Sequence, residues 1–360
     1  SHVDKPEVAM ENSPAHTIIV IGAGIVGASL AYHLATKGAK VTLIEAQDIA
    51  CGVTKTSFAW INTTHPAPDP IGQLRDAAIQ EYHRLQAQLP GLEIRWTGAL
   101  TYGAAPVPSA VRVCRSQILD LEPNLKHPPE QATYAAEEGA LDAVAATHAL
   151  VKGAQAHGAT VLTQTQVLGF ATQGDQVTAV ETPRGFIAAD VVVLAAGTGT
   201  AKLAEMLGAE LPINASPAIF IRYKTHTSLV KTLISSPEME VRHAADGTLL
   251  AAEDYLDDTL DNPPIAIARR TAQAIQNELQ GVVSIEPELA CVGLRPMPAD
   301  GIPIIGYLPQ VGGVYVCAMH PGVMLAAVVG RLASEEIIDG KVSSALAPCR
   351  PDRFVRCPAT

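Results

Sequence analysis

Residues 17–45 read TIIVIGAGIVGASLAYHLATKGAKVTLIE, and this stretch decides the fold. The β-branched run 17–21 predicts a buried strand, the pattern through Leu34 predicts a helix that ends at Gly38, and 40–45 predicts a second buried strand. A strand, a helix and a strand within about thirty residues form the crossover unit of a parallel sheet. The N-terminal part of the chain is therefore expected to be an α/β domain.

The turn between the first strand and the helix carries a G-x-G-x-x-G pattern. Gly22 permits a tight turn, Gly24 lets backbone amides approach a pyrophosphate, and Gly27 lets the helix pack closely on the strand. Glu45 ends the second strand, where a carboxylate accepts hydrogen bonds from ribose hydroxyls and repels the 2′-phosphate of NADP. The pattern predicts dinucleotide binding by this loop, including Ile25 and Val26, but does not choose between NAD and FAD.

Composition excludes several classes of partner. The chain has 360 residues, of which 48% are hydrophobic, and a net charge of −11 from 36 acidic and 25 basic residues. This balance argues against nucleic acid or an anionic membrane surface as the main partner. No apolar run approaches the roughly 20 residues of a membrane helix. The six cysteines are scattered without metal-ligand spacing, so we expect reduced thiols, no metal and a cytoplasmic protein.

Further along the chain, strand and helix patterns indicate a discontinuous arrangement. Buried strands are expected at 160–162, 190–195 and 314–316, and antiparallel strands over 213–289 around a helix at 266–279. We therefore expect a Rossmann-like nucleotide-binding domain and a second, mainly antiparallel β-sheet domain that binds substrate. The expected ranges are 15–62, 145–200 and 290–345 for the first domain, 63–144 and 201–289 for the second, and 1–14 and 346–360 for two tails.

Four further motifs occur in the chain after the glycine loop. They are TSFAWIN (56–62), VVVLAAGTGT (191–200), GLRPMPADGIPIIG (293–306) and AMHPGVMLAAVVGRL (318–332). Together with 17–45, they resemble the D-amino-acid oxidase superfamily of FAD-dependent oxidoreductases, in particular its glycine oxidase and sarcosine oxidase branch, over residues 18 to about 340. The last helix is preceded by His-Pro-Gly here, where Gly-His is commoner in the family.

The resemblance implies FAD as the cofactor and assigns roles to particular positions. No cysteine is placed for the covalent flavin link of the sarcosine oxidases; Cys317 is nearest, and we expect a buried thiol there and non-covalent FAD. A helix N-terminus at Gly322 would face the flavin's pyrimidine edge and stabilise negative charge there. The residues expected to contact FAD are Gly22, Gly24, Ile25, Val26, Gly27, Glu45, Thr54, Thr56, Ser57, Ala59, Trp60, Val167, Ala196, Gly197, Arg295, Pro321, Gly322, Val323 and Met324.

Candidate substrate residues follow from the chemistry of flavin amine oxidation, in which the protein mainly orients the substrate. Arg295 is the leading candidate, because a guanidinium binds a carboxylate in two parallel hydrogen bonds. Arg242 is a candidate for a second carboxylate, with strand alternation leaving even odds that it faces the flavin. Trp60 and Tyr223 are candidates for the walls of the site. For His320, polarising substrate, assisting oxygen reduction and capping the last helix all stay open.

The sequence thus favours an oxidase of a small carboxylate-bearing amine such as glycine, sarcosine, iminodiacetate or a D-amino acid, with O₂ as the acceptor and hydrogen peroxide as a product. If Arg242 joins Arg295 in the site, a dicarboxylate such as iminodiacetate becomes attractive. The first alternative is an amine or opine-type dehydrogenase that passes electrons to a quinone or a partner subunit. The second is a non-enzymatic dinucleotide-binding protein. A homo-oligomer and a complex with a partner subunit both stay open.

Overall fold

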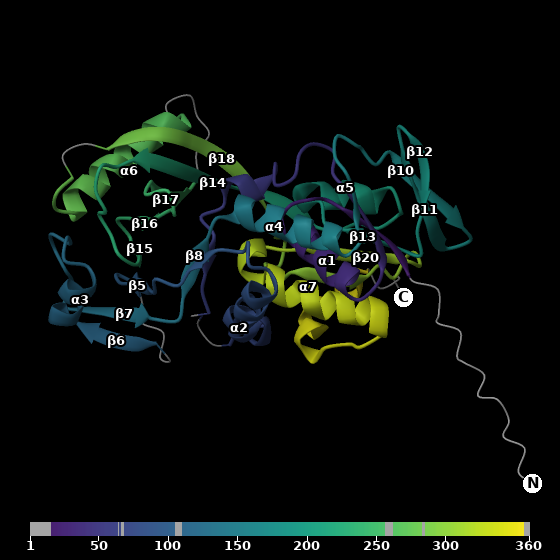
Figure 1. The fold of residues 1–360 in the computed structure, drawn as a ribbon, viewed down its shortest axis with the longest axis horizontal. Helices are drawn as coiled ribbons and strands as arrows, with labels where there is room; N and C mark the ends of the chain where they lie inside the picture. Colours follow the sequence, from purple (N-terminus) through teal and green to yellow (C-terminus); the bar gives the residue numbers. More distant parts are fainter. Residues whose placement is uncertain are drawn as a thin grey trace, which may run out of the picture.

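The computed structural model describes residues 16–63, 65, 68–104, 110–255, 262–282 and 285–355. The described chain forms two lobes, one built on a six-stranded sheet and one on an eight-stranded sheet (Figure 1). The expected mixed α/β class is confirmed. The expected tail 1–14 lies outside the described residues.

The six-stranded sheet contains the strands expected from the buried β-branched runs. Its neighbouring strands pair in parallel, except that the first strand of the order runs antiparallel to the second. In spatial order the strands are β19 (Ile304–Tyr307), β20 (Val314–Ala318), β13 (Val191–Leu194), β1 (Thr17–Ile21), β2 (Lys40–Ile44) and β9 (Thr160–Leu162). Since β1 lies in the middle of the parallel strands, the glycine loop that follows it begins at the carboxyl edge of the sheet, where α/β folds bind ligands.

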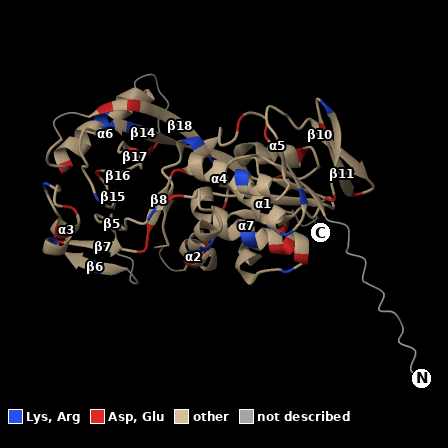
Figure 2. Cartoon of the chain, in the orientation of Figure 1, with Lys and Arg blue, Asp and Glu red and all other residues tan. Residues whose placement is uncertain are grey.

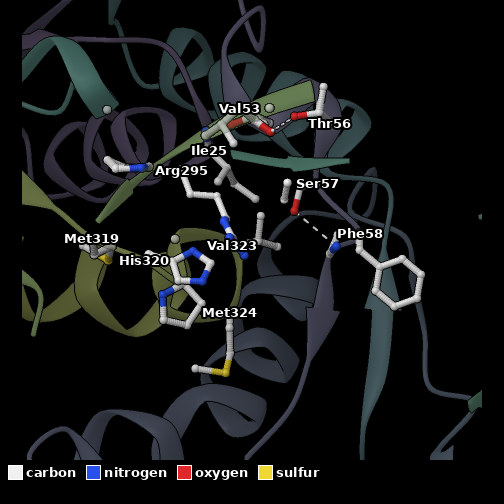
Figure 3. Close-up of a pocket in the computed structure, with 18 of the residues that line it drawn as sticks. Ile25, Val53, Thr56, Ser57, Phe58, Arg295, Met319, His320, Val323 and Met324 are labelled. Atoms are coloured by element: carbon white, nitrogen blue, oxygen red, sulfur yellow. Dashed lines mark hydrogen bonds between the residues drawn. The ribbon is translucent and has the colours of Figure 1, made fainter. Parts of the chain in front are cut away.

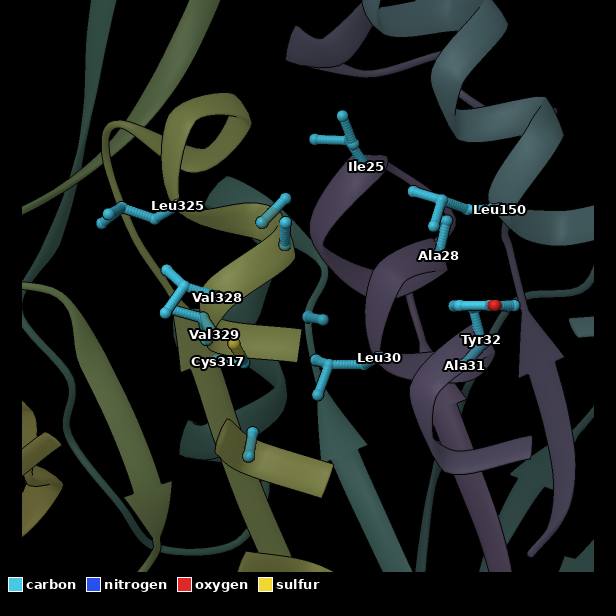
Figure 4. Close-up of a cluster of buried hydrophobic side chains, with 14 of the residues drawn as sticks. Ile25, Ala28, Leu30, Ala31, Tyr32, Leu150, Cys317, Leu325, Val328 and Val329 are labelled. Carbon is cyan, nitrogen blue, oxygen red and sulfur yellow. The ribbon is translucent and has the colours of Figure 1, made fainter. Parts of the chain in front are cut away.

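Helices bury one face of this sheet. The largest apolar cluster joins α1 (Ile25–Thr36), α2 (Gly72–Gln88), α4 (Ala143–Ala156) and α7 (Gly322–Asp339), with Leu30, Leu150 and Val329 among its buried members (Figure 4). Gly330 in α7 allows close packing on α1, because a Cβ there would lie 2.2 Å from the hydroxyl oxygen of Ser29. The opposite face is covered by α5 (Thr200–Glu205) and by a three-stranded sheet of β10 (Gly169–Gln173), β11 (Gln176–Thr182) and β12 (Gly185–Ala188).

The eight-stranded sheet forms the second lobe, with α6 (Pro264–Glu278) packed on one face and α3 (Arg115–Leu121) following β6. Its strands, in spatial order, are β18 (Glu286–Pro298), β14 (Ile213–Lys224), β17 (Leu249–Asp254), β16 (Glu240–His243), β15 (Leu233–Ser235), β5 (Ala99–Thr101), β7 (Gln131–Ala135) and β6 (Val111–Cys114). A small sheet of β3 (Trp60–Ile61), β8 (Gly139–Leu141) and β4 (Ile94–Arg95) lies between the two lobes.

Strand register decides which side chains of the eight-stranded sheet point toward the first lobe. Directly opposed residues share a face, and faces alternate along each strand. Ile221, Tyr223 and Val241 share the face that packs with buried residues of α6. Arg242 and Arg295 therefore lie on the other face, and so do the even-numbered residues of β17.

Packing places some segments differently from the expected domain ranges. α2 falls in the range 63–144, yet its buried residues join the cluster of α1 and α7. We therefore propose that α2 belongs with the FAD-binding domain. The expected C-terminal tail is wrong for 346–355: these residues form the short 3-10 helices η3 (Ser344–Cys349) and η4 (Pro351–Phe354), and Leu346 and Cys349 are fully buried.

Charged residues are scattered over both lobes (Figure 2). Within the described ranges, no helix is both long and apolar enough to cross a membrane. No group of three or more His, Cys, Asp or Glu side chains in that part of the chain is arranged to hold a metal ion.

Candidate active site

The glycine loop has the geometry that its sequence predicts. Gly22 has φ +109°, and a Cβ there would lie 2.2 Å from the carbonyl oxygen of Ala195. A Cβ on Gly27 would lie 1.8 Å from the carbonyl oxygen of Gly22. Glu45 is brought beside this loop, where its carboxylate accepts a hydrogen bond from the amide of Ala23 at 3.0 Å. A side chain at position 22 would therefore push the loop away from the residue that follows β13, and one at position 27 would push α1 away from the loop.

A second segment, η1 (Val53–Thr56) with the following residues 57–59, lies across the start of α1. The hydroxyl of Thr54 accepts a hydrogen bond from the amide of Ile25 at 3.1 Å and so binds this segment to the first turn of α1. Ala59 has φ +60°, and its amide donates to the Ser57 hydroxyl at 3.2 Å (Figure 3). First-turn amides of a helix have no partner within the helix, so those of Val26 and Gly27 are suited to receive an anion.

The N-terminus of α7 forms the third wall. Pro321 precedes the helix, and His320, Val323 and Met324 face the same space (Figure 3). The hydroxyl of Tyr82 on α2 donates to the carbonyl of Val323 and fixes the first turn. Burial lowers the pKa of His320 to about 4, and the nearby charges of Arg295 and Arg75 act in the same direction. His320 is therefore neutral at physiological pH.

These walls enclose a cavity of about 620 Å³, and β14, β16, β17 and β18 roof it. Arg295 extends from β18 into the cavity toward His320 and Val323 (Figure 3). Its guanidinium donates from Nη2 to the Ser216 hydroxyl at 2.9 Å and to Asp254 Oδ1 at 3.2 Å. Because Asp254 is mostly exposed, a substrate carboxylate competes with it for this guanidinium at little cost.

Most of the residues expected from the sequence line this single cavity. From the glycine loop these are Gly24, Ile25 and Val26; from the following segment Thr54, Thr56, Ser57, Ala59 and Trp60; and from the late strands and α7 Gly197, Arg295, His320, Pro321, Gly322, Val323 and Met324. Gly22, Gly27, Glu45, Val167 and Ala196 do not line it. Val167 is buried in the core under β10 and β11, and Glu45 lies behind the glycine loop.

Arg242 and Tyr223 do not reach the cavity. The guanidinium of Arg242 is buried and donates to the carbonyls of Phe58 and Leu141, both at 2.9 Å. It therefore joins the eight-stranded sheet to the 57–59 segment and to β8, and the substrate role expected for it is not supported. Tyr223 is fully buried on the opposite face of the sheet, where its hydroxyl donates to the carbonyl of Ala268 on α6 at 2.6 Å. A substrate role for Tyr223 is likewise not supported.

Several cavity residues were missed by sequence reasoning. Arg75 on α2 lines the cavity and donates to Asp69 at 2.7 Å, but nothing in the sequence links this helix to the site. Glu240 and Asp254 line the roof, and only strand register reveals this. Gly293 is closest to having a sequence signal, because a glycine inside a strand often marks a close backbone approach. A Cβ there would lie 2.0 Å from the hydroxyl oxygen of Thr56.

The site is suited to a bound dinucleotide with a flat ring system. The glycine loop and α1 offer amides for a pyrophosphate, and the α7 N-terminus faces the deeper part of the same cavity. Residues 17–336 match the family model described as FAD dependent oxidoreductase. The chain belongs to this DAO family of FAD-dependent oxidoreductases, and the expected family and cofactor are confirmed.

Curated relatives with similar sequences and solved structures with a similar fold were also found. The chain is 26% identical over 341 residues to a glycine oxidase of Pseudomonas aeruginosa, covering 88% of this chain and 93% of that protein. It is 24% identical to an opine oxidase subunit of Agrobacterium tumefaciens, covering 93% and 96%. Among solved structures, iminodiacetate oxidase from Chelativorans superposes with a TM-score of 0.81 at 20% identity, covering 93% and 98%. L-proline dehydrogenase from P. horikoshii gives a TM-score of 0.85 at 22% identity, covering 94% and 98%.

Proposed function

We propose that the chain oxidises a small amine that carries a carboxylate, of the glycine, sarcosine or iminodiacetate type. The observation that carries this proposal is Arg295, whose guanidinium enters the cavity beside the N-terminus of α7. A buried or half-buried guanidinium binds a carboxylate with charge-assisted hydrogen bonds and never loses its charge. The relatives named glycine oxidase support this substrate class.

The cavity residues fit bound FAD, and different segments would contact its pyrophosphate and its ring system. Gly24, Val26 and the segment that contains Thr54 would hold the pyrophosphate, and Gly322 with Val323 would face the ring. When bound, FAD supplies a two-electron acceptor for the hydride of the carbon that bears nitrogen, and returns the electrons to an external acceptor. We infer non-covalent binding, since burial raises the pKa of the Cys317 thiol and so keeps it protonated.

The protein's own contribution is to position and desolvate the substrate. Arg295 would fix the carboxylate, and the roof strands would cover the reacting carbon from one side. Because His320 is neutral, it adds no cation beside the amine and is able to donate or accept one hydrogen bond. The carbon loses a hydride and the nitrogen a proton, which gives an imine; water then hydrolyses the imine to a 2-oxo acid and ammonia or an amine.

With O₂ as the acceptor, two electrons and two protons yield hydrogen peroxide. The second candidate is a dehydrogenase that passes the electrons to a quinone or a partner subunit. This dehydrogenase alternative is supported by the relative named as an opine oxidase subunit and by the structural likeness to L-proline dehydrogenase.

An absorbance spectrum followed by anaerobic titration tests the proposal. Purified holoprotein is titrated with glycine, sarcosine, iminodiacetate and D-alanine while the flavin bands are followed. Bleaching by one of these amines is the expected result. Air that restores the bands and yields peroxide identifies an oxidase, whereas bands that recover only with a quinone identify a dehydrogenase. A protein whose flavin no amine bleaches would contradict both and would revive the non-enzymatic alternative.

A further inference from the structure

On the face of the roof sheet that looks toward the first lobe, three charged side chains line the cavity: Glu240, Asp254 and Arg295. Ser216 pairs with Arg295, and Ala218 pairs with both Gly293 and Asp254, so Arg295 and Asp254 lie on one face. The pairing of Val241 with Ala251 brings Glu240 opposite Ala252, which is on the same face as Asp254. All three charged residues line the cavity. Since the sheet order is β18-β14-β17-β16, Glu240 stands one strand beyond Asp254, on the side away from Arg295.

The other cavity charges have protein partners. Arg295 pairs with Asp254 at 3.2 Å, and Arg75 pairs with Asp69 at 2.7 Å. Among the described residues, the carboxylate of Glu240 has no hydrogen bond and no ion pair. Arg242, two residues along the same strand face, directs its guanidinium to backbone carbonyls instead.

An unpaired carboxylate in a partly buried site is costly. Burial, together with the nearby charge of Asp254, raises the pKa of Glu240 to about 7. Charged groups removed from water are ordinarily paired with an opposite charge or with hydrogen-bond donors. Arg295 and Arg75 also line the cavity, but they pair with Asp254 and Asp69, and no described side chain forms a hydrogen bond or ion pair with the Glu240 carboxylate. A cationic group on a bound ligand would supply the missing partner.

We propose that Glu240 binds a cationic group of the substrate at the end opposite the carboxylate held by Arg295. This inference rests on the proposed function and narrows its substrate class. The preferred amines are those with a second positive charge, on a basic side chain or a basic N-substituent. The Arg295 guanidinium reaches the Asp254 carboxylate. Glu240 lies on the next strand and two positions along from Asp254, which places their Cα atoms roughly 8 Å apart. An extended lysine-like or arginine-like side chain spans such a gap, whereas glycine does not.

A matched pair of ligands tests the role of Glu240. Racemic lysine and racemic norleucine differ at the terminal ammonium, and the racemates remove any dependence on the handedness of the site. Each is titrated anaerobically into holoprotein, and the dissociation constant is read from the change in the flavin spectrum or from heat of binding. Wild-type protein is expected to bind lysine about 10 to 100 times more tightly than norleucine, the range of a charge-assisted hydrogen bond.

Glu240→Gln keeps the shape of the side chain and removes its charge. We expect this variant to bring the lysine-to-norleucine ratio close to one, with norleucine binding unchanged. Glu238→Gln makes the same chemical change on an exposed residue just before β16 and is expected to keep the wild-type ratio. A ratio that is the same in wild type and Glu240→Gln would overturn the inference. If Glu240→Gln does not fold, the wild-type measurement still decides: equal binding of lysine and norleucine would overturn the inference.

The two proposals fail in different ways. If no amine bleaches the flavin but lysine binding still depends on Glu240, the proposed oxidation is wrong and the cation site stands. If glycine or sarcosine bleaches the flavin and lysine shows no preference over norleucine, the oxidation stands and the cation site is wrong.

Discussion

Replacing Gly293 by alanine is expected to weaken both the fold and FAD binding through a single contact. The new Cβ would lie 2.0 Å from Thr56 Oγ1, 3.0 Å from Thr56 Cβ and 3.4 Å from Val53 Cγ2. Restoring an ordinary contact of roughly 3.5 Å requires the Thr56 side chain to rotate and give up its hydrogen bond to the Val53 carbonyl, or η1 to move away from β18. Overpacking of this kind costs about 1–3 kcal/mol. Because η1 also lines the cavity, we expect the FAD dissociation constant to rise by roughly 5- to 150-fold.

The partner of this contact makes the prediction sharper. Thr56→Ala removes the closest atom and leaves Cβ at 3.0 Å, so the double variant with Gly293→Ala should recover part of the loss. A double-mutant cycle on urea unfolding of the holoprotein, with FAD dissociation followed by flavin fluorescence, measures this coupling. The reasoning is refuted if Gly293→Ala changes stability by less than about 0.5 kcal/mol, or if the two substitutions are additive.

Four further predictions follow from the site and the core. Arg295→Gln should raise the KM of a carboxylate-bearing amine about 10²- to 10³-fold and leave the flavin spectrum unchanged; an unchanged KM would contradict its role. Gly22→Ala should yield protein without FAD, because the added Cβ would lie 2.2 Å from a backbone carbonyl oxygen; a yellow product with normal stability would count against this. His320 has its pKa lowered to about 4, so the unfolded chain, with a pKa near 6.5, binds more protons, and stability should fall as pH drops from 6.5 toward 4; urea unfolding of wild type and His320→Gln at pH 7 and pH 5 checks whether the variant loses part of this dependence. Gly330→Ala should cost about 1–3 kcal/mol by overlap with Ser29, and a melting temperature equal to that of wild type would contradict the close packing of α1 on α7.

The sequence predicted the geometry of the glycine loop well because that geometry depends on local rules. Gly22 and Gly27 follow a strand and open a helix, and their spacing alone implies the turn, the close approach and the exposed amides. The segments that line the deeper part of the cavity come from distant parts of the chain, yet each carries a motif of its own, so the resemblance singled them out. Their contacts with FAD, and the substrate role of Arg295, stay predictions.

The roof of the cavity was predicted poorly, because strand alternation alone does not say which face of the sheet points to the cavity and which packs on α6. Arg242 and Tyr223 were both plausible substrate residues until register placed Tyr223 against α6 and the carbonyls of Phe58 and Leu141 engaged Arg242. Glu240 had no signal in the sequence, since an acidic residue at the start of a short strand is ordinary. Residues 346–360 were expected to be a tail outside both domains, but short 3-10 turns bury Leu346. Such turns have no hydrophobic periodicity from which the sequence could predict them.

The contacts of Arg242 also bear on how this protein tolerates change. Its guanidinium is bound by main-chain oxygens of the 57–59 segment and of β8, and these oxygens are present whatever side chains stand there. The guanidinium also lies 5.4 Å from the centroid of the Phe58 ring. The hydrogen bonds therefore leave residue 141 free to vary in identity, whereas the Phe58 ring adds a side-chain contact and position 242 itself is constrained. A library that diversifies the roof to change substrate preference should leave this arginine in place, since losing it would remove the hydrogen bonds that join the 57–59 segment and β8 to the roof.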